Sequence, residues 1–106
     1  MYRMEGDGDG ALGACCAADA ISFAFALAAP PTGHFVASGG SNPACPGTAG
    51  SPQASPGHLC VYEEAKTGNV ANSGLVSTTR YGADLFVDSN APGDYLSKGS
   101  WAVPAP

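Results

Sequence analysis

The stretch Asn42–Glu64, NPACPGTAGSPQASPGHLCVYEE, decides the fold of this chain. It holds two of the four cysteines, Cys45 and Cys60, which lie fifteen positions apart. Three prolines and three glycines separate them, a composition that disfavours regular secondary structure. The run HLCVYE that follows is rich in β-branched and aromatic residues and alternates, so we expect a strand over 58–63. The stretch therefore predicts a long Pro/Gly-rich loop that ends in a strand.

The two cysteines allow two interpretations. A bond between Cys45 and Cys60 would close a loop of about 15 residues, order it, and contribute about 3 kcal/mol in the chain-entropy model. The alternative is a pair of reduced, buried thiols in a reducing compartment. Alternation along the strand places Cys60 on the face opposite Leu59 and Val61. A Cys60–His58 nucleophile pair has no third group to orient it, so we expect the chemistry here to be structural.

Further strand-like runs lie on both sides of this stretch. Polar residues at 64–69, 72–74 and 90–93 are expected to form turns between them. With 58–63 included, we expect strands at 20–29, 32–37, 58–63, 75–81, 83–88 and 94–103. Six strands and no convincing helix predict an all-β fold, a small antiparallel β-sandwich or jelly-roll-like domain.

Two of these runs carry finer expectations. The run 20–29, AISFAFALAA, is expected to place Phe25 on the same buried face as its other large residues, Ile21, Phe23 and Leu27. Its opposite face is small and only weakly polar, so a second subunit could cover it. In the run 94–103, Gly99 predicts a β-bulge.

The length of 106 residues allows one domain. We expect residues 1–19 to be a flexible leader or a residual first strand, and residues 20–106 to form a single β domain. Asp7 and Asp9 are weak metal candidates, because an EF-hand loop that began at Asp7 would have an alanine at its twelfth position. A Gly/Asp turn explains them better. The neighbouring cysteines Cys15 and Cys16 stay unassigned.

Charge and motifs exclude several function classes. The net charge is −5 with only four Lys and Arg residues, too few to neutralise a nucleic-acid backbone. No apolar run is long enough for membrane insertion as a helix. The chain contains no nucleophile elbow, P-loop, HExxH motif or dinucleotide fingerprint, so we expect neither an enzyme nor a cofactor. The acidic pairs Glu63/Glu64 and Asp84/Asp88 are interpreted as solvated strand residues.

Aromatic and histidine side chains supply the remaining binding candidates. Trp101, Tyr95 and Tyr81 could form a sugar-stacking platform, with core or edge packing as the competing role. His34 and His58 are each interpreted as a packed or surface histidine.

A resemblance extends this interpretation over residues 20–106. The most specific segment that carries it runs from Cys45 to PGHLCVYE. On this segment, and on the weaker matches given below, the chain resembles an uncharacterised C-terminal β domain of secreted bacterial proteins that often follows low-complexity or collagen-like regions. The resemblance implies an extracellular setting and a Cys45–Cys60 disulfide, and it implies no activity. The matching residues are His34-Phe35, Cys45 to Thr48, Ala54, Pro56 to Glu63, Gly82, Phe86-Val87 and Gly99 to Val103.

These observations predict a non-catalytic extracellular structural or interaction module. Its role would be stalk-capping, oligomerisation as a dimer or trimer, or surface adhesion, with a surface glycan as a candidate partner. The alternative is a carbohydrate- or calcium-binding β domain. We expect it to be secreted or at the cell surface, and we expect its own signal peptide to be absent from this chain, because the first residues lack a basic segment followed by an apolar one.

Overall fold

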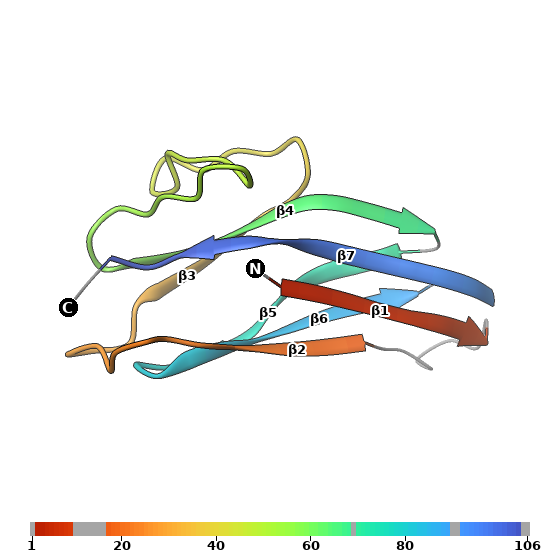
Figure 1. Ribbon diagram of the computed structural model, residues 1–106, viewed down its shortest axis with the longest axis horizontal. Helices are drawn as coiled ribbons and strands as arrows, with labels where there is room; N and C mark the ends of the chain where they lie inside the picture. Colours follow the sequence, from red (N-terminus) through yellow and green to blue (C-terminus); the bar gives the residue numbers. More distant parts are fainter. Residues whose placement is uncertain (1, 10–16, 69, 90–91, 105–106) are drawn as a thin grey trace.

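Strands are the only regular elements in the described part of the chain. The computed structural model describes residues 2–9, 17–68, 70–89 and 92–104. Figure 1 shows the strands as two layers. The all-β prediction is confirmed, with seven strands instead of six: β1 (Tyr2–Asp9), β2 (Ala17–Ser22), β3 (Thr32–Val36), β4 (His58–Gly68), β5 (Val70–Thr78), β6 (Gly82–Ser89) and β7 (Pro92–Ala102). None of the described residues forms a helix long and apolar enough to cross a membrane.

The two sheets have the strand orders β1-β7-β4-β3 and β2-β6-β5. The chain passes from one sheet to the other four times, between β1 and β2, between β2 and β3, between β4 and β5 and between β6 and β7. The ribbon β1–β2 therefore runs beside the ribbon β6–β7 around both layers, which is the rolled arrangement of a jelly-roll-like sandwich. Four of the five strand pairs are antiparallel, namely β1 with β7, β2 with β6, β4 with β7 and β5 with β6. The fifth pair, β3 with β4, is parallel. The purely antiparallel expectation is wrong at this pair, because the long loop 37–57 returns the chain to the start of β3 before β4 begins.

The strand predicted over 20–29 is wrong in its second half. Strand β2 ends at Ser22, and the following backbone binds the β5–β6 hairpin instead of a neighbouring strand. Phe23 N donates to Tyr81 O at 2.9 Å, and Leu27 N donates to Arg80 O at 3.0 Å. Phe25 is consequently 66% exposed and does not share the buried face.

Three predicted turns and one strand end also need correction. Strand β4 continues through the predicted turn at 64–69 as far as Gly68, because β7 is long enough to pair with it to the end. Strand β5 includes 72–74, where it pairs with β6. The predicted turn at 90–93 is partly strand, since β7 begins at Pro92. Strand β5 also ends at Thr78, before the predicted end at 81, because Thr79 N donates to Gly82 O at 2.8 Å and closes a hairpin.

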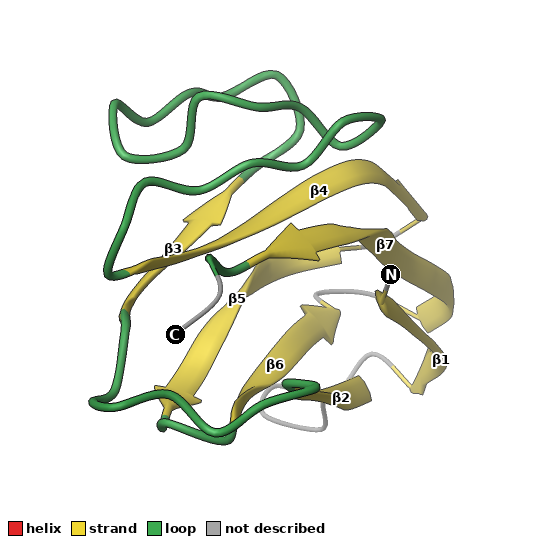
Figure 2. Ribbon diagram, turned by 60° about the vertical axis from the view of Figure 1, so that its left-hand side comes forward, coloured by secondary structure: helices red, strands yellow, loops and turns green. Residues whose placement is uncertain are grey.

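Apolar residues form two separate clusters on the two faces of β4. Leu59 and Val61 face the second sheet, where they are fully buried. The other members of this main core come from β1, β2 and β6: Tyr2, Met4, Ile21, Ala83, Leu85 and Val87. The smaller cluster lies on the outer face of β3 and β4, beneath the loop 37–57 (Figure 2), and consists of Val36, Cys45, Cys60 and Tyr62, with Ala49 and Ala54 packed against them.

The Cys45–Cys60 disulfide is present and fixes the loop 37–57 to β4. Its Cα atoms are 5.6 Å apart. A hydrogen bond extends this attachment, since Gly47 N donates to the Tyr62 hydroxyl of β4 at 2.9 Å. Within the loop, Ser55 N donates to Ala44 O at 3.0 Å. A segment without regular secondary structure is thus held to β4 by one covalent bond and one side-chain hydrogen bond, and is braced by a backbone contact of its own.

Candidate functional site

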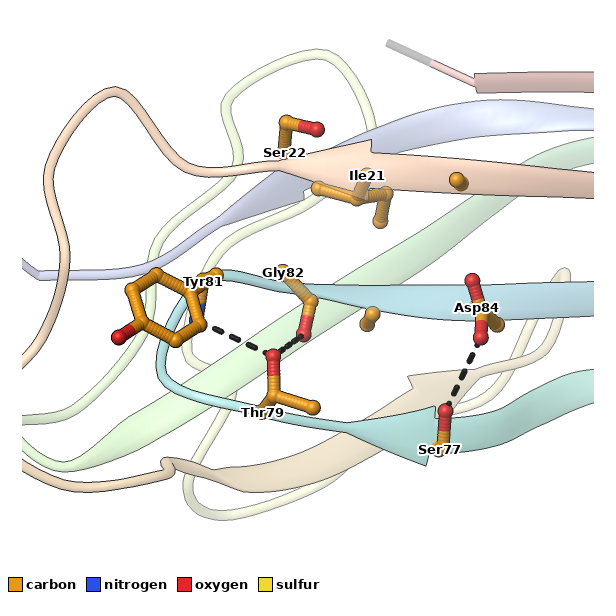
Figure 3. A pocket seen from close by; sticks show the side chains of 9 residues that line it. Ile21, Ser22, Ser77, Thr79, Tyr81, Gly82 and Asp84 are labelled. Atoms are coloured by element: carbon orange, nitrogen blue, oxygen red, sulfur yellow. Dashed lines mark hydrogen bonds between the residues drawn. The ribbon is translucent and has the colours of Figure 1, made fainter.

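A shallow pocket opens on the outer side of the three-stranded sheet, where β2 ends beside the β5–β6 hairpin (Figure 3). The hairpin is fixed by its own polar contacts. Thr79 Oγ1 donates to Gly82 O at 3.3 Å and accepts from Tyr81 N at 3.1 Å. A side chain at Gly82 would put its Cβ 1.9 Å from Ile21 O, so glycine permits the close approach of β6 to β2.

The pocket is polar and has a volume of about 230 Å³. Hydroxyl groups, one carboxylate and one aromatic ring line it. Ser77 Oγ donates to Asp84 Oδ2 at 3.1 Å, so these two side chains stand together on the outer face. Asp84 is exposed, as the sequence predicted. The lining residues are Ala20, Ile21, Ser22, Ser77, Thr79, Tyr81, Gly82, Ala83 and Asp84.

Tyr81 gives this pocket an exposed and oriented aromatic ring. Its side chain is 62% exposed. The Arg80 guanidinium carbon lies 5.2 Å from the centroid of the ring, and Arg80 Nε donates to Leu27 O at 2.9 Å. The cation is therefore anchored to the backbone while it packs on one face of the ring. Tyr81 is the predicted binding residue that the structure places at a pocket.

Trp101, the second predicted aromatic residue, does not line this pocket. Trp101 packs on Phe23, with ring centroids 5.8 Å apart, and both adjoin the main core. This is the packing role that competed with sugar stacking. Tyr95 belongs to β7, where its backbone lies opposite Gly6 of β1 and Gly68 of β4, and its side chain lies outside the described residues.

The predicted metal candidates lie where the structure describes backbone only. Asp7 and Asp9 belong to β1, which pairs with β7 through Asp9, so the predicted Gly/Asp turn is wrong for residues 7–9. Their side chains lie outside the described residues, as do Cys15 and Cys16 altogether. Among the described side chains, no group of three or more His, Cys, Asp or Glu residues could hold a metal ion.

Glu63 is buried rather than solvated, which corrects its interpretation as a surface carboxylate. It is 4% exposed. Ser73 Oγ donates to its Oε2 at 2.8 Å, Ser97 Oγ donates to the same oxygen at 2.7 Å, and Ser38 N donates to Oε1 at 3.2 Å. The hydroxyl of Tyr2 lies 3.2 Å from Ser97 Oγ. This network joins the two sheets and satisfies the carboxylate within the core.

His34 and His58 form a pair that the sequence interpretation missed. His34 Nε2 lies 2.8 Å from His58 Nδ1, and the rings stack with centroids 5.0 Å apart. The parallel pairing of β3 with β4 brings them together, since it sets Thr32 opposite His58 and His34 opposite Cys60. The signal in the sequence is a repeated Gly-His dipeptide near the start of each strand, which has meaning only once the parallel pairing is known.

Comparisons of the chain with protein families, with curated proteins and with solved structures give no match.

Proposed function

We propose that this chain is a non-catalytic binding module of secreted or cell-surface proteins that adheres to glycans through the pocket beside Tyr81. The observation that carries the proposal is an exposed aromatic ring, held in place by Arg80, next to the Asp84 carboxylate and the hydroxyls of Ser22 and Ser77. The domain would then serve as a terminal adhesive module of a surface protein.

The chemistry of the pocket matches that of a sugar. One face of a pyranose carries C–H groups that pack on an aromatic ring, and its edge carries hydroxyls that donate to carboxylates. Tyr81 would take the first role and Asp84 the second. A few polar groups beside an apolar surface are typical of sites that orient a small ligand. No step in this role requires a nucleophile or a metal ion.

An extracellular setting is supported by the disulfide between Cys45 and Cys60. Disulfides persist in oxidising compartments and are rare in the cytosol of mesophiles. The low charge content, 12% of residues, and the nine prolines are compatible with this setting but do not demand it.

Glycan binding by the oxidised protein tests the proposal. A screen on a glycan array, followed by calorimetry, should identify a ligand. Tyr81→Ala should then weaken binding about fivefold or more, because an aromatic contact contributes about 1 kcal/mol beyond its area. Asp84→Ala should weaken it as well. Phe25→Ala is the matched control, since Phe25 is an exposed aromatic residue that does not line the pocket. A wild-type protein that binds no glycan would refute the proposal.

Self-association is the second candidate function, and two further exposed side chains favour it. Phe25 is 66% exposed and Val76 is 65% exposed, both near the hairpin that carries Tyr81. A contact between copies would remove these apolar surfaces from water. Light scattering of the oxidised protein should then give a dimer or trimer that Phe25→Ser dissociates. A monomer at every concentration excludes this candidate.

A further inference from the structure

The His34–His58 pair is joined to the loop 37–57 through Asn42. Asn42 Nδ2 lies 3.4 Å from His34 Nδ1, and His34 Nε2 lies 2.8 Å from His58 Nδ1. All three side chains are partly buried. The two histidines belong to β3 and β4, whereas Asn42 belongs to the loop, so this chain of contacts connects the loop with the sheet that it covers.

One neighbouring contact fixes the protons in this chain. Ala44 N donates to Asn42 Oδ1 at 2.9 Å, so the amide oxygen faces away from the histidine and the NH₂ group faces it. His34 Nδ1 must therefore accept. In a neutral imidazole the other nitrogen carries the proton, so His34 Nε2 donates to His58 Nδ1. Both nitrogens that receive a hydrogen bond here are unprotonated.

We propose that this arrangement makes the docking of the loop 37–57 acid-sensitive. A proton taken up at His34 Nδ1 turns the acceptor into a donor that faces the NH₂ group of Asn42, which breaks the loop contact. A second proton, at His58 Nδ1, makes that nitrogen a donor that faces the donor His34 Nε2, and both rings then carry a positive charge. The hydrogen bond between the rings is then broken. Acid is the condition that adds the first proton, and that proton alone is enough to break the loop contact.

No carboxylate near the pair compensates the added positive charge among the described groups. The loop 37–57 contains no Asp, Glu, Lys, Arg or His, and its one cysteine is in the disulfide. On the same face of β4 the titratable neighbour is Tyr62, whose hydroxyl donates to Gln53 O.

The charged residues of the adjoining strands are remote or point elsewhere. Glu63 of β4 binds serines in the core, and the exposed Glu64 lies six positions beyond His58, about 20 Å along an extended strand. On β7, Lys98 pairs with Ala65, still farther along, and on β1 Arg3 lies opposite Lys98.

Hydrogen exchange of the oxidised protein tests the proposal, with excess EDTA present to exclude metal effects. The amides to follow are those of Ala44 and Cys45, which donate to Asn42 Oδ1 and Asn42 O. Between about pH 7.5 and pH 5 their protection, corrected for the intrinsic rate, should fall about tenfold, as expected for the loss of one hydrogen bond. The amide of Leu85, in the main core, serves as internal control and should not change. Unchanged protection of Ala44 and Cys45 overturns the proposal.

Two substitutions give opposite results if the proposal is correct. In Asn42→Asp the side chain still accepts from Ala44 N, but it now offers a carboxylate oxygen to protonated His34, so protection should rise in acid. In His34→Gln the protection should become independent of pH. If Asn42→Asp keeps the wild-type direction, or if His34→Gln keeps the acid response, the proposal is wrong. These outcomes do not depend on the glycan proposal, which concerns the β5–β6 hairpin.

Discussion

Glu63 was interpreted from the sequence as a solvated surface residue, but the structure places it in the core. Three donors satisfy its carboxylate, two of them serine hydroxyls and one a backbone amide. Loss of this acceptor would leave the fully buried Ser97 hydroxyl without it, at about 1–3 kcal/mol, and would remove a partner from the partly buried Ser73 and from the backbone of the exposed Ser38. The same carboxylate is linked to Tyr2 through Ser97, which donates to Glu63 and lies within hydrogen-bond distance of the Tyr2 hydroxyl.

Tyr2 makes the stability of the domain sensitive to alkaline pH. Burial raises the pKa of Tyr2 from 10.0 to about 12, the hydrogen bond with Ser97 opposes this, and the nearby Glu63 carboxylate adds to it. The folded-state pKa lies above that of the unfolded chain. The stabilisation is therefore complete below pH 10 and is lost as the pH rises through about 12. We expect the free energy of unfolding to fall by at most about 2 kcal/mol over this range.

Urea unfolding at a series of pH values measures this effect, with Tyr2→Phe as the control. The variant keeps the buried ring and loses the ionisable hydroxyl, so its stability should fall less steeply above pH 10. The other tyrosines are the same in both proteins, so their contribution cancels in the comparison. Equal slopes in the two proteins would show that Tyr2 does not carry the effect.

The sequence contained part of this residue-level information. Alternation puts Glu63 in phase with Leu59 and Val61, which both face the core, so the burial of Glu63 follows from periodicity. Its charge argued against burial, because the serine donors come from strands whose register cannot be read from the chain. Tyr81 was identified as exposed and aromatic, but its pocket depends on the β5–β6 hairpin and on where β2 ends.

The pairing of strands β4 and β7 brings their backbones so close together at Gly99 that only glycine fits there. The register of β4 with β7 shifts between Glu63 and Ala65, so the bulge lies in β4 opposite Gly99, whereas the sequence predicted it in the final strand. A Cβ at Gly99 would lie 1.8 Å from Tyr62 O. Glycine was thus a correct signal of irregularity, but which of two paired strands holds the additional residue is decided by the pairing.

Gly99→Ala should destabilise the domain by at least about 3 kcal/mol or prevent folding, because the Tyr62 carbonyl belongs to the paired backbone and cannot move away freely. Gly50→Ala is the matched control. The nearest atom to a Cβ there is Thr48 Oγ1 at 4.0 Å, so its effect should stay within about 0.5 kcal/mol. Soluble yield and thermal unfolding measure both variants, and equal stability of the two would contradict the close contact.

The loop 37–57 is an element whose order depends on the disulfide. Replacing both cysteines, Cys45→Ala with Cys60→Ala, should lower the free energy of unfolding by about 3 kcal/mol. The smaller apolar cluster is separate from the main core. We therefore expect the loop amides to lose protection against hydrogen exchange while those of β6 keep theirs. Urea unfolding and hydrogen exchange of the double variant test this, and a variant as stable as the wild type would contradict it.

The whole molecule is held together by contacts between distant parts of the chain. Strand β1 pairs with β7, and Tyr2 lies opposite Gly99. The sequence predicted the class of fold, since alternation and turn residues are local signals. It did not predict the parallel pairing of β3 with β4, and it left open whether residues 1–19 are a flexible leader or a residual first strand, because both depend on which distant edges meet.

This topology predicts slow folding. Domains dominated by non-local strand pairing fold in milliseconds to seconds, since the entropy of loop closure is lost before the contacts form. Stopped-flow refolding of the oxidised protein should give rates in that range. The variant without Cys45 and Cys60 should refold more slowly, because it must close the loop 37–57 during folding. Refolding within microseconds, or equal rates in the two proteins, would contradict this prediction.

The antiparallel pairing of the first and last strands also determines how the domain responds to mechanical force. Because Tyr2 of β1 lies beside Gly99 of β7, the described ends of the chain leave the same region of one sheet. Tension applied across them loads the hydrogen bonds one pair at a time, as in unzipping, and not all together, as in shear. Such a domain resists stretching poorly as a link within a chain under load.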